Sequence, residues 1–266
     1  MEDMNRIDRF HEIAMQHQSL MRDILVVPPV RPHDGLSVDL SCMLSAWYNV
    51  GIQWRPKEDM MGGFIEFTRM NIADQFLRQH TQKYLLMIDN DTDPPIELPW
   101  LLARHDAPVV GSCIVSNSPK GRPMLCFSRP DASGTNRMID FMEGDKIPAT
   151  GLAEVPHCGT GAMMIRRDVL ESFTMEKLPN GQWDVPFLVD QDVKVRGMRC
   201  GKLIEGEDIR FCKQVRAKGF KVYVDLEAHC GHRKIMKMTF PDSQRDPSLR
   251  VENWVVSDKG MVMSDD

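Results

Sequence analysis

The chain has 266 residues, of which 42% are hydrophobic and 27% are charged, with a formal net charge of −5. This length suits one large domain or two small ones with a sizeable core, and the composition is typical of a globular protein. The negative net charge gives no support to broad, nonspecific nucleic-acid binding, although it is compatible with a local basic patch.

Three further features bear on the compartment in which the chain is expected to work. No stretch approaches the roughly 18–20 apolar residues of a membrane span. The charged opening segment, MEDMNRIDRFHEIAMQHQSL, lacks the apolar core of a signal peptide. The seven cysteines form no C-x-x-C pair, which is typical of reduced, buried thiols. We therefore expect a cytoplasmic protein without a membrane span, in the host cytoplasm if a phage encodes it.

Strands and helices are expected to alternate through the first half of the chain. Apolar positions at helical spacing predict helices, and short β-branched apolar runs predict buried strands. The expected elements are, in order, a helix over 3–21, a strand and its loop over 23–30, a helix over 37–49 with Ser37 as its N-cap, a helix over 68–80, a strand over 84–88, a helix over 96–104 and a strand over 107–115. This alternation favours an α/β fold with a mainly parallel sheet flanked by helices.

The second half of the chain is less regular. Residues 116–150 are rich in Ser, Pro, Gly and Asn, which predicts a loop-rich insertion or a small β-ribbon. The expected elements beyond it are a turn around Gly159 and Gly161, a short strand, a helix from about Arg167, an irregular segment over 174–202, a helix over 207–218, a strand over 220–224 and a tail over 233–266. Gly219 is a suitable C-cap for the helix over 207–218.

An acidic turn follows the predicted strand 84–88. Asp89, Asp91 and Asp93 alternate there, and alternating carboxylates suit a hard cation. A calcium loop of the EF-hand kind is excluded, because Pro94 stands where its turn requires Gly and Trp100 stands where its bidentate Glu belongs. Carboxylates after a strand are expected at the carboxyl edge of the sheet, where α/β proteins bind ligands.

Two later segments also carry groups that suit catalysis or metal binding. Glu207 and Asp208 open a predicted helix, where acidic side chains are also explained by the helix dipole. The segment HCGH over 229–232 follows the last predicted core strand, and with Cys158 or Cys230 it contains zinc-ligand residue types without the usual C-x-x-C spacing. Each feature is weak alone, and the order of all three along the chain is more specific.

That order resembles the GT-A glycosyltransferases, particularly the inverting enzymes of the family-2 type, from about residue 23 to 232. The motifs that carry the resemblance are ILVVPPVRP (24–32), TRMNIADQFL (68–77), LLMIDNDTDPP (85–95, with the D-x-D pattern), PHCGTGAMMIRRDVLE (156–171), GEDIRFCKQVRAKGFKVYVD (206–225) and HCGH (229–232). The resemblance implies a Rossmann-like catalytic domain over 1–232. Within it, 23–115 would bind a nucleotide-sugar, 150–232 would serve the acceptor and catalysis, and 233–266 would be a tail or lid.

The resemblance also implies roles for the acidic residues and the last histidine. Mn²⁺ or Mg²⁺ would bridge the diphosphate of the donor, with Asp91 as a direct ligand, His232 as a further ligand, and Asp89 at the ribose or a metal-bound water. Inversion requires a general base for the acceptor hydroxyl, for which Asp208 is favoured over Glu207.

Other residues would border the donor or the acceptor in such an enzyme. Arg69 and Asn71 stand in an R-M-N spacing that departs from the tighter R-N of the family, and Trp183 would stack on a sugar or pack as a lid. The remaining residues expected at the nucleotide, sugar or acceptor are Pro28, Val30, Arg31, Asn90, Gly159, Thr160 and Gly161.

The acceptor is open at this point, and so is the oligomeric state. A soluble glycan or another cytoplasmic hydroxyl compound is favoured. A phage-type enzyme acting on hydroxymethylated DNA bases is the alternative, because the basic segments RRD (166–168) and RKIMK (233–237) would permit DNA contact. The second segment would otherwise close over the phosphates or form a solvated tail. A nucleotidyltransferase and a non-catalytic nucleotide-sugar-binding protein are the competing classes.

Overall fold

A computed structural model gives the fold of the chain. It describes residues 2–30, 35–58, 65–117, 123–130, 136–140, 150–179, 183–187, 206–232, 254–257 and 260–263. The chain divides into two units, Met1–Arg233 and Lys234–Asp266. In the second unit, strands β13 (Trp254–Ser257) and β14 (Gly260–Met263) pair antiparallel.

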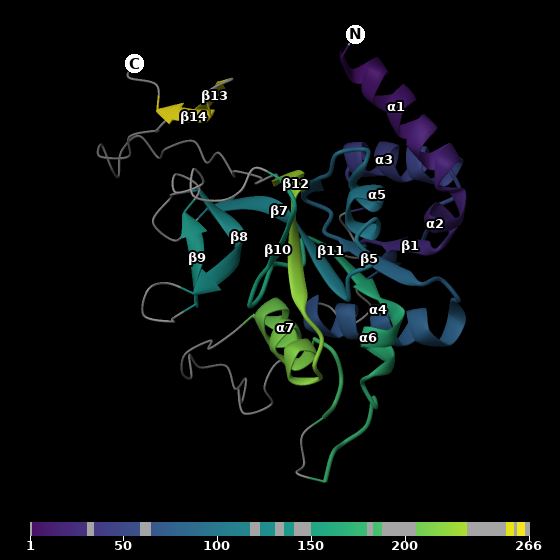
Figure 1. The fold of residues 1–266 in the computed structure, drawn as a ribbon, viewed down its shortest axis with the longest axis vertical. Coiled ribbons are helices and arrows are strands. Elements are labelled where there is room, and N and C mark those ends of the chain that lie inside the picture. The colour runs from purple at the N-terminus through teal and green to yellow at the C-terminus, as the bar shows by residue number, and fades with distance from the viewer. Residues whose placement is uncertain are drawn as a thin grey trace, which may run out of the picture. The chain divides into compact units, whose positions relative to one another are not determined.

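A twisted central sheet organises the first unit (Figure 1). Its main path runs β10 (Leu152–Glu154), β12 (Val222–His232), β7 (Val109–Asn117), β11 (Ala162–Arg166), β5 (Tyr84–Ile88), β1 (Ile24–Val27) and β3 (Gln53–Trp54). β1 is parallel to β3 and β5, and β12 is parallel to β7. β11 runs antiparallel between β5 and β7, and β10 runs antiparallel to β12. Strands β3, β1, β5, β7 and β12 therefore share one direction, and the predicted α/β fold with a mainly parallel sheet is confirmed.

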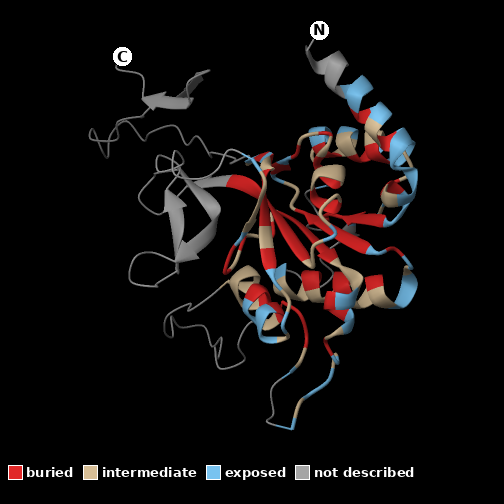
Figure 2. Ribbon diagram, in the orientation of Figure 1, coloured by how far each residue is buried: buried red, intermediate tan, exposed pale blue. Residues whose placement is uncertain are grey.

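Helices cover both faces of this sheet. Side chains of α1 (Glu2–Gln16), α2 (Gln18–Arg22), α3 (Val38–Asn49) and α5 (Leu98–Ala103) form one apolar core with the strands. Side chains of α4 (Ile65–Gln79), α6 (Arg167–Glu171) and α7 (Glu207–Ala217) form the other. Successive strand residues enter opposite cores, as the two-residue period of a strand requires. The central strands β1, β5 and, except for Arg166, β11 are consequently buried on both faces (Figure 2).

Several local predictions are confirmed at the residue level. The strand over 84–88 is β5, with every residue buried. Ser37 is the N-cap of α3, since its side-chain oxygen accepts a hydrogen bond from the Leu40 N–H at 3.3 Å. Gly219 follows the end of α7 with a φ of +89°, the conformation for which glycine is suited.

Other elements differ from the sequence expectation. The expected strand in 23–30 is β1, which ends before Pro28, a residue with no N–H to donate to a ladder; the expected loop contains the short strand β2 (Pro29–Val30). β2 pairs parallel with β4 (Lys57–Glu58) instead of joining the main sheet. The last core strand is longer than 220–224: β12 continues to His232, with a register shift against β7 between Asp225 and His229.

The insertion over 116–150 contains a β-ribbon. β8 (Pro123–Pro130) pairs antiparallel with β7 and with β9 (Asn136–Asp140). Residues 141–149 lie outside the described part of the chain. In the residues for which the structure gives positions, no helix has the length and apolar character needed to span a membrane.

Candidate active site at the carboxyl edge of the sheet

The acidic turn after β5 is held against the start of β11. The Asp89 N–H donates to the Gly161 carbonyl oxygen at 2.8 Å, and the Thr92 hydroxyl donates to the same oxygen at 2.9 Å. The turn is closed by the Thr92 N–H, which donates to the Asp89 carbonyl at 3.0 Å. Because β11 runs antiparallel to β5, its first residues lie at the carboxyl edge of the sheet beside this turn.

Gly161 is surrounded closely by protein atoms. A Cβ added there would lie 2.7 Å from Ile114 Cδ1, 3.4 Å from Thr92 Oγ1 and 3.9 Å from Asp89 Oδ2. The small residue thus leaves room for Ile114 of β7 beside the acidic turn. This reason differs from the expected close approach of a ligand to the Gly161 backbone. Its neighbour Thr160 is 4% exposed. Contact of Gly159 and Thr160 with a ligand stays a prediction.

Arg69 links the turn to the start of α7. It lies on α4, and its side chain is 3% exposed. Its Nη2 donates to Asp89 Oδ1 at 2.6 Å, and its Nη1 donates to Glu207 Oε1. Sequence reasoning placed all three residues in one site but gave no sign of this direct contact, because Glu207 is far from the other two along the chain.

Burial and nearby negative charge raise the pKa values of the two carboxylates, Asp89 and Glu207, that share the Arg69 guanidinium. Burial raises the pKa of Asp89, and the charge of Asp91 adds to that rise, although Arg69 opposes it. Burial also raises the pKa of Glu207, with Arg69 again opposing and Asp208 and Asp89 adding to the rise. One guanidinium therefore does not offset the loss of water around both groups and the nearby carboxylates.

Asp91 in the acidic turn contacts His232 at the end of β12. His232 Nε2 lies 3.1 Å from Asp91 Oδ2, with side-chain exposures of 16% and 50%. Strand β6 (Thr92–Asp93) pairs antiparallel with the end of β12, where His232 faces Thr92. The extension of β12 beyond 224 therefore brings the imidazole to the acidic turn. Within the described residues, no three His, Cys, Asp or Glu side chains are grouped as a set of metal ligands.

Asp208 lies beside Glu207 in the first turn of α7. Its Oδ1 accepts a hydrogen bond from the Ile209 N–H at 2.7 Å. The preceding residue, Gly206, is the N-cap and provides no side-chain hydrogen bond to the helix. A Cβ at Gly206 would lie 2.7 Å from Asp208 Oδ1, so the carboxylate turns back over the N-cap.

Asn90, between the two aspartates, holds the loop before α3. Its Oδ1 accepts from the Ser37 N–H at 2.8 Å, and its Nδ2 donates to the Gly35 carbonyl at 2.9 Å. Both ends of the amide are thus bound to backbone. Gly35 and Ser37 were not recognised as site residues, and the only signal for them was the N-cap role of Ser37.

The structure gives the burial and the position in the fold of most of the remaining expected site residues. Pro28 and Val30 are buried at the end of β1 and in β2, and Asn71 is partly buried on α4. Trp183 is 41% exposed and forms an isolated bridge with Lys177. Arg31 lies outside the described residues, and so does the segment 233–237.

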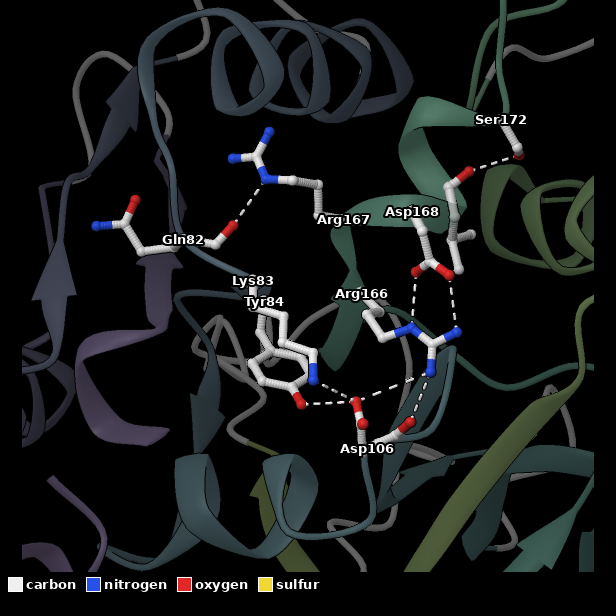
Figure 3. Close-up of polar contacts among 9 residues, drawn as sticks. Gln82, Lys83, Tyr84, Asp106, Arg166, Arg167, Asp168 and Ser172 are labelled. Carbon is white, nitrogen blue, oxygen red and sulfur yellow. Dashed lines mark hydrogen bonds and ion pairs between the residues drawn. The ribbon is translucent and has the colours of Figure 1, made fainter. Parts of the chain in front are cut away.

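The RRD segment is bound within the fold (Figure 3). Arg166 donates to both carboxylate oxygens of Asp168, at 2.7 and 2.8 Å, and to the Asp106 carbonyl at 2.7 Å. Arg167 donates to the Gln82 carbonyl at 2.8 Å. These contacts lie at the end of β11 and the start of β5, which is the opposite edge of the sheet from the acidic turn.

Comparisons with known proteins give structural likeness only. No protein-family model matches the chain, and no curated protein matches it. Among solved structures, "Crystal Structure of A197 from STIV" matches with a TM-score of 0.48 and 19% identity, over 79% of this chain and 85% of that one. "Crystal structure of GalNAc-T7 with UDP, GalNAc and Mn2+" matches with a TM-score of 0.46 and 12% identity, over 88% of this chain and 40% of that one. Likeness at this level assigns neither an activity nor a ligand.

Proposed function

We propose that the chain is a metal-dependent inverting glycosyltransferase, which moves a sugar from a nucleotide-diphosphate sugar to an acceptor hydroxyl. One observation carries the proposal: Arg69 bonds both Asp89 and Glu207, while His232 contacts Asp91. Groups from four separate segments thereby meet at the edge where α/β sheets bind ligands. The D-x-D turn, the E-D helix and the last histidine are also the parts that the resemblance to GT-A enzymes assigns to catalysis.

The donor side is assigned to Asp91, His232 and Asp89. A half-exposed carboxylate and an adjacent imidazole are ligands that Mn²⁺ accepts, and Mg²⁺ is the other candidate. A bound cation supplies Lewis-acid stabilisation of the departing diphosphate. Asp89 gives one oxygen to Arg69, and its second oxygen would contact the ribose or a metal-bound water. Donor binding is assigned to 23–115, with Pro28, Val30, Arg31, Asn71 and Asn90 bordering the nucleotide.

The acceptor side is assigned to the first turn of α7, within 150–232. As the acceptor oxygen bonds to the anomeric carbon, the bond from that carbon to the diphosphate oxygen breaks and the hydroxyl proton passes to a carboxylate. Asp208 is the proposed base. Glu207 is less favoured, because its Oε1 is already bound to the Arg69 guanidinium.

The acceptor that we propose is a hydroxyl of a soluble glycan or another cytoplasmic molecule. DNA is less favoured, because Arg166 and Arg167 are engaged within the fold. Those arginines also lie at the sheet edge opposite the acidic turn. The segment 166–168 therefore gives no open basic patch beside the site for a phosphate backbone to contact.

A panel of nucleotide-sugars, tested with and without Mn²⁺, examines the donor assignment. A ligand that binds the native state raises its apparent stability. We expect a metal-dependent rise in Tm with one class of nucleoside diphosphate sugar. Asp91→Asn should abolish that rise, whereas Asp93→Asn, a matched change at the next exposed carboxylate of the turn, should keep it.

The reaction itself is tested by its products and by a variant of the base. The released product should be a nucleoside diphosphate, and release of pyrophosphate would instead identify a nucleotidyltransferase. Asp208→Asn should keep the metal-dependent rise in Tm but lose sugar transfer. Normal transfer by Asp208→Asn would refute the assignment of the base.

A further inference from the structure

We infer that Arg69 is a positioning residue, which fixes the first turn of α7 relative to the acidic turn and thereby sets the direction of Asp208. This inference rests on the proposed function of the site. It departs from the sequence expectation that Arg69 contacts the donor. The observation behind it is the double contact of one guanidinium, through Nη2 with Asp89 and through Nη1 with Glu207.

Burial separates a positioning role from a donor-binding role. The Arg69 side chain is 3% exposed, whereas Asp91 in the same site is 50% exposed. A guanidinium with so little surface has no face left for a phosphate or a base. Both of its terminal nitrogens are already bound to carboxylates. Its remaining Nε–H is buried with no acceptor among the described residues, which costs stability. Such a cost is typical of functional positions.

The shape of the side chain suits a link between two carboxylates. Arginine presents its nitrogens in a rigid planar fork, whereas lysine has one compact ammonium on a flexible stem. The fork reaches Asp89 and Glu207 at once, which lie on different elements. A lysine at position 69 would keep the positive charge but could not hold both carboxylates in the same arrangement.

The start of α7 depends on this link. Its N-cap, Gly206, offers no side-chain hydrogen bond, and Glu207 joins the helix start to Arg69 and through it to the acidic turn. Asp208 is the next residue along the helix. A shift of Glu207 therefore carries Asp208 with it, and displacement of a catalytic group by about 1 Å lowers the rate by about 100-fold.

Arg69→Lys is the direct test, with kcat and nucleotide-sugar affinity measured separately. We expect kcat to fall about 100-fold, while the Kd for the nucleotide-sugar in Mn²⁺ changes by less than about threefold. Arg78→Lys is the matched control, because Arg78 lies on the same helix but is 73% exposed in a surface ion pair. It should leave kcat and Kd unchanged. A loss of affinity as large as the loss of kcat/KM, with kcat unchanged, would overturn the inference.

A double variant tests whether Arg69 acts through Glu207. Glu207→Gln keeps the shape of the side chain and removes its charge, so it also weakens the link. If both changes break one link, Arg69→Lys with Glu207→Gln should be no slower than the slower single variant. Losses of kcat that multiply would show that the two residues act independently and would refute the inference. If Arg69→Lys does not fold, amide exchange at 207–211 in unliganded Glu207→Gln decides the question: faster exchange than in the parent supports the link, and unchanged exchange overturns it.

Amide hydrogen exchange separates this inference from the proposed function, because it requires no substrate. In the unliganded Arg69→Lys protein, amides at 207–211 should exchange faster than in the parent, and those of β5 should not. Faster exchange in Arg69→Lys, together with a parent protein that transfers no sugar, would support the link and refute the proposed function. Unchanged exchange at 207–211 would sink the link, whatever the activity.

Discussion

A side chain at position 161 should disturb the packing of the buried Ile114 of β7 beside the acidic turn. In Gly161→Ala, the added Cβ would lie 2.7 Å from Ile114 Cδ1, well inside contact distance, and Ile114 is itself buried. Overpacking of this kind costs about 1–3 kcal/mol. The loss of backbone freedom in the unfolded chain returns about 0.4–1 kcal/mol. We therefore expect a net loss of about 1–2 kcal/mol in the free energy of unfolding.

Removing Ile114 Cδ1, the atom that the added Cβ would approach too closely, should reduce this loss of stability. Ile114→Val deletes Cδ1 and by itself should cost about 0.5–1.5 kcal/mol. If the clash with Cδ1 causes the damage, the double variant should be more stable than the sum of the two losses predicts, by about 1 kcal/mol or more. Urea denaturation followed by circular dichroism measures all three free energies of unfolding.

Gly219→Ala provides the matched control. A Cβ at Gly219 meets nothing within 4 Å, and its cost comes from the φ of +89°. Its loss should add to that of Ile114→Val within about 0.5 kcal/mol, because the two changes share no contact. Additive losses for Gly161→Ala and Ile114→Val would refute the packing explanation of Gly161.

Three further predictions concern a cap, a buried acid and the thiols. Ser37→Ala removes the side-chain cap of α3 and should cost about 1 kcal/mol in urea denaturation, whereas Ser37→Gly should cost only a few tenths. Burial raises the pKa of Glu207, so the folded state holds the Glu207 proton more tightly than the unfolded state does. The stability that results is fully present below the unfolded-state pKa and is lost as the pH rises through the folded-state pKa, so the Tm should fall over that range. Glu207→Gln should make this fall in Tm smaller. Burial raises the pKa of Cys113 and Cys230 to about 12, so iodoacetamide at pH 8 should modify exposed Cys42 and leave these two thiols unmodified until denaturant is added. Peptide mapping identifies the modified residues, and early modification of Cys113 would contradict this prediction.

Much of the fold could be predicted because local chemistry determines it. The run Tyr84–Ile88 has no polar side chain except the Tyr84 hydroxyl, which is typical of a strand buried on both faces. Ser37 and Gly219 mark helix ends through interactions with their immediate neighbours. The acidic turn was placed correctly at the carboxyl edge, because the position of a loop relative to its strand follows from chain order.

The contacts of the site could not be predicted in the same way. Arg69 and Glu207 are 138 positions apart, and no periodicity or local propensity connects them. The place of His232 depends on β12 continuing through an irregularity in its register, which a pattern of apolar residues does not reveal. The sequence motifs therefore identified the participating segments, whereas the pairing between side chains required the fold.

The direction of β11 explains why these segments form a single site. In a wholly parallel sheet, the residues before a strand lie at the amino edge, away from the loops that bind ligands. Because β11 runs antiparallel, Gly161 precedes it at the carboxyl edge, where its carbonyl oxygen accepts from both the Asp89 N–H and the Thr92 hydroxyl. Thr92 in turn pairs with His232 in the ladder between β6 and β12. The one reversed strand between β5 and β7 thus supplies the support that holds the acidic turn in reach of both Arg69 and His232.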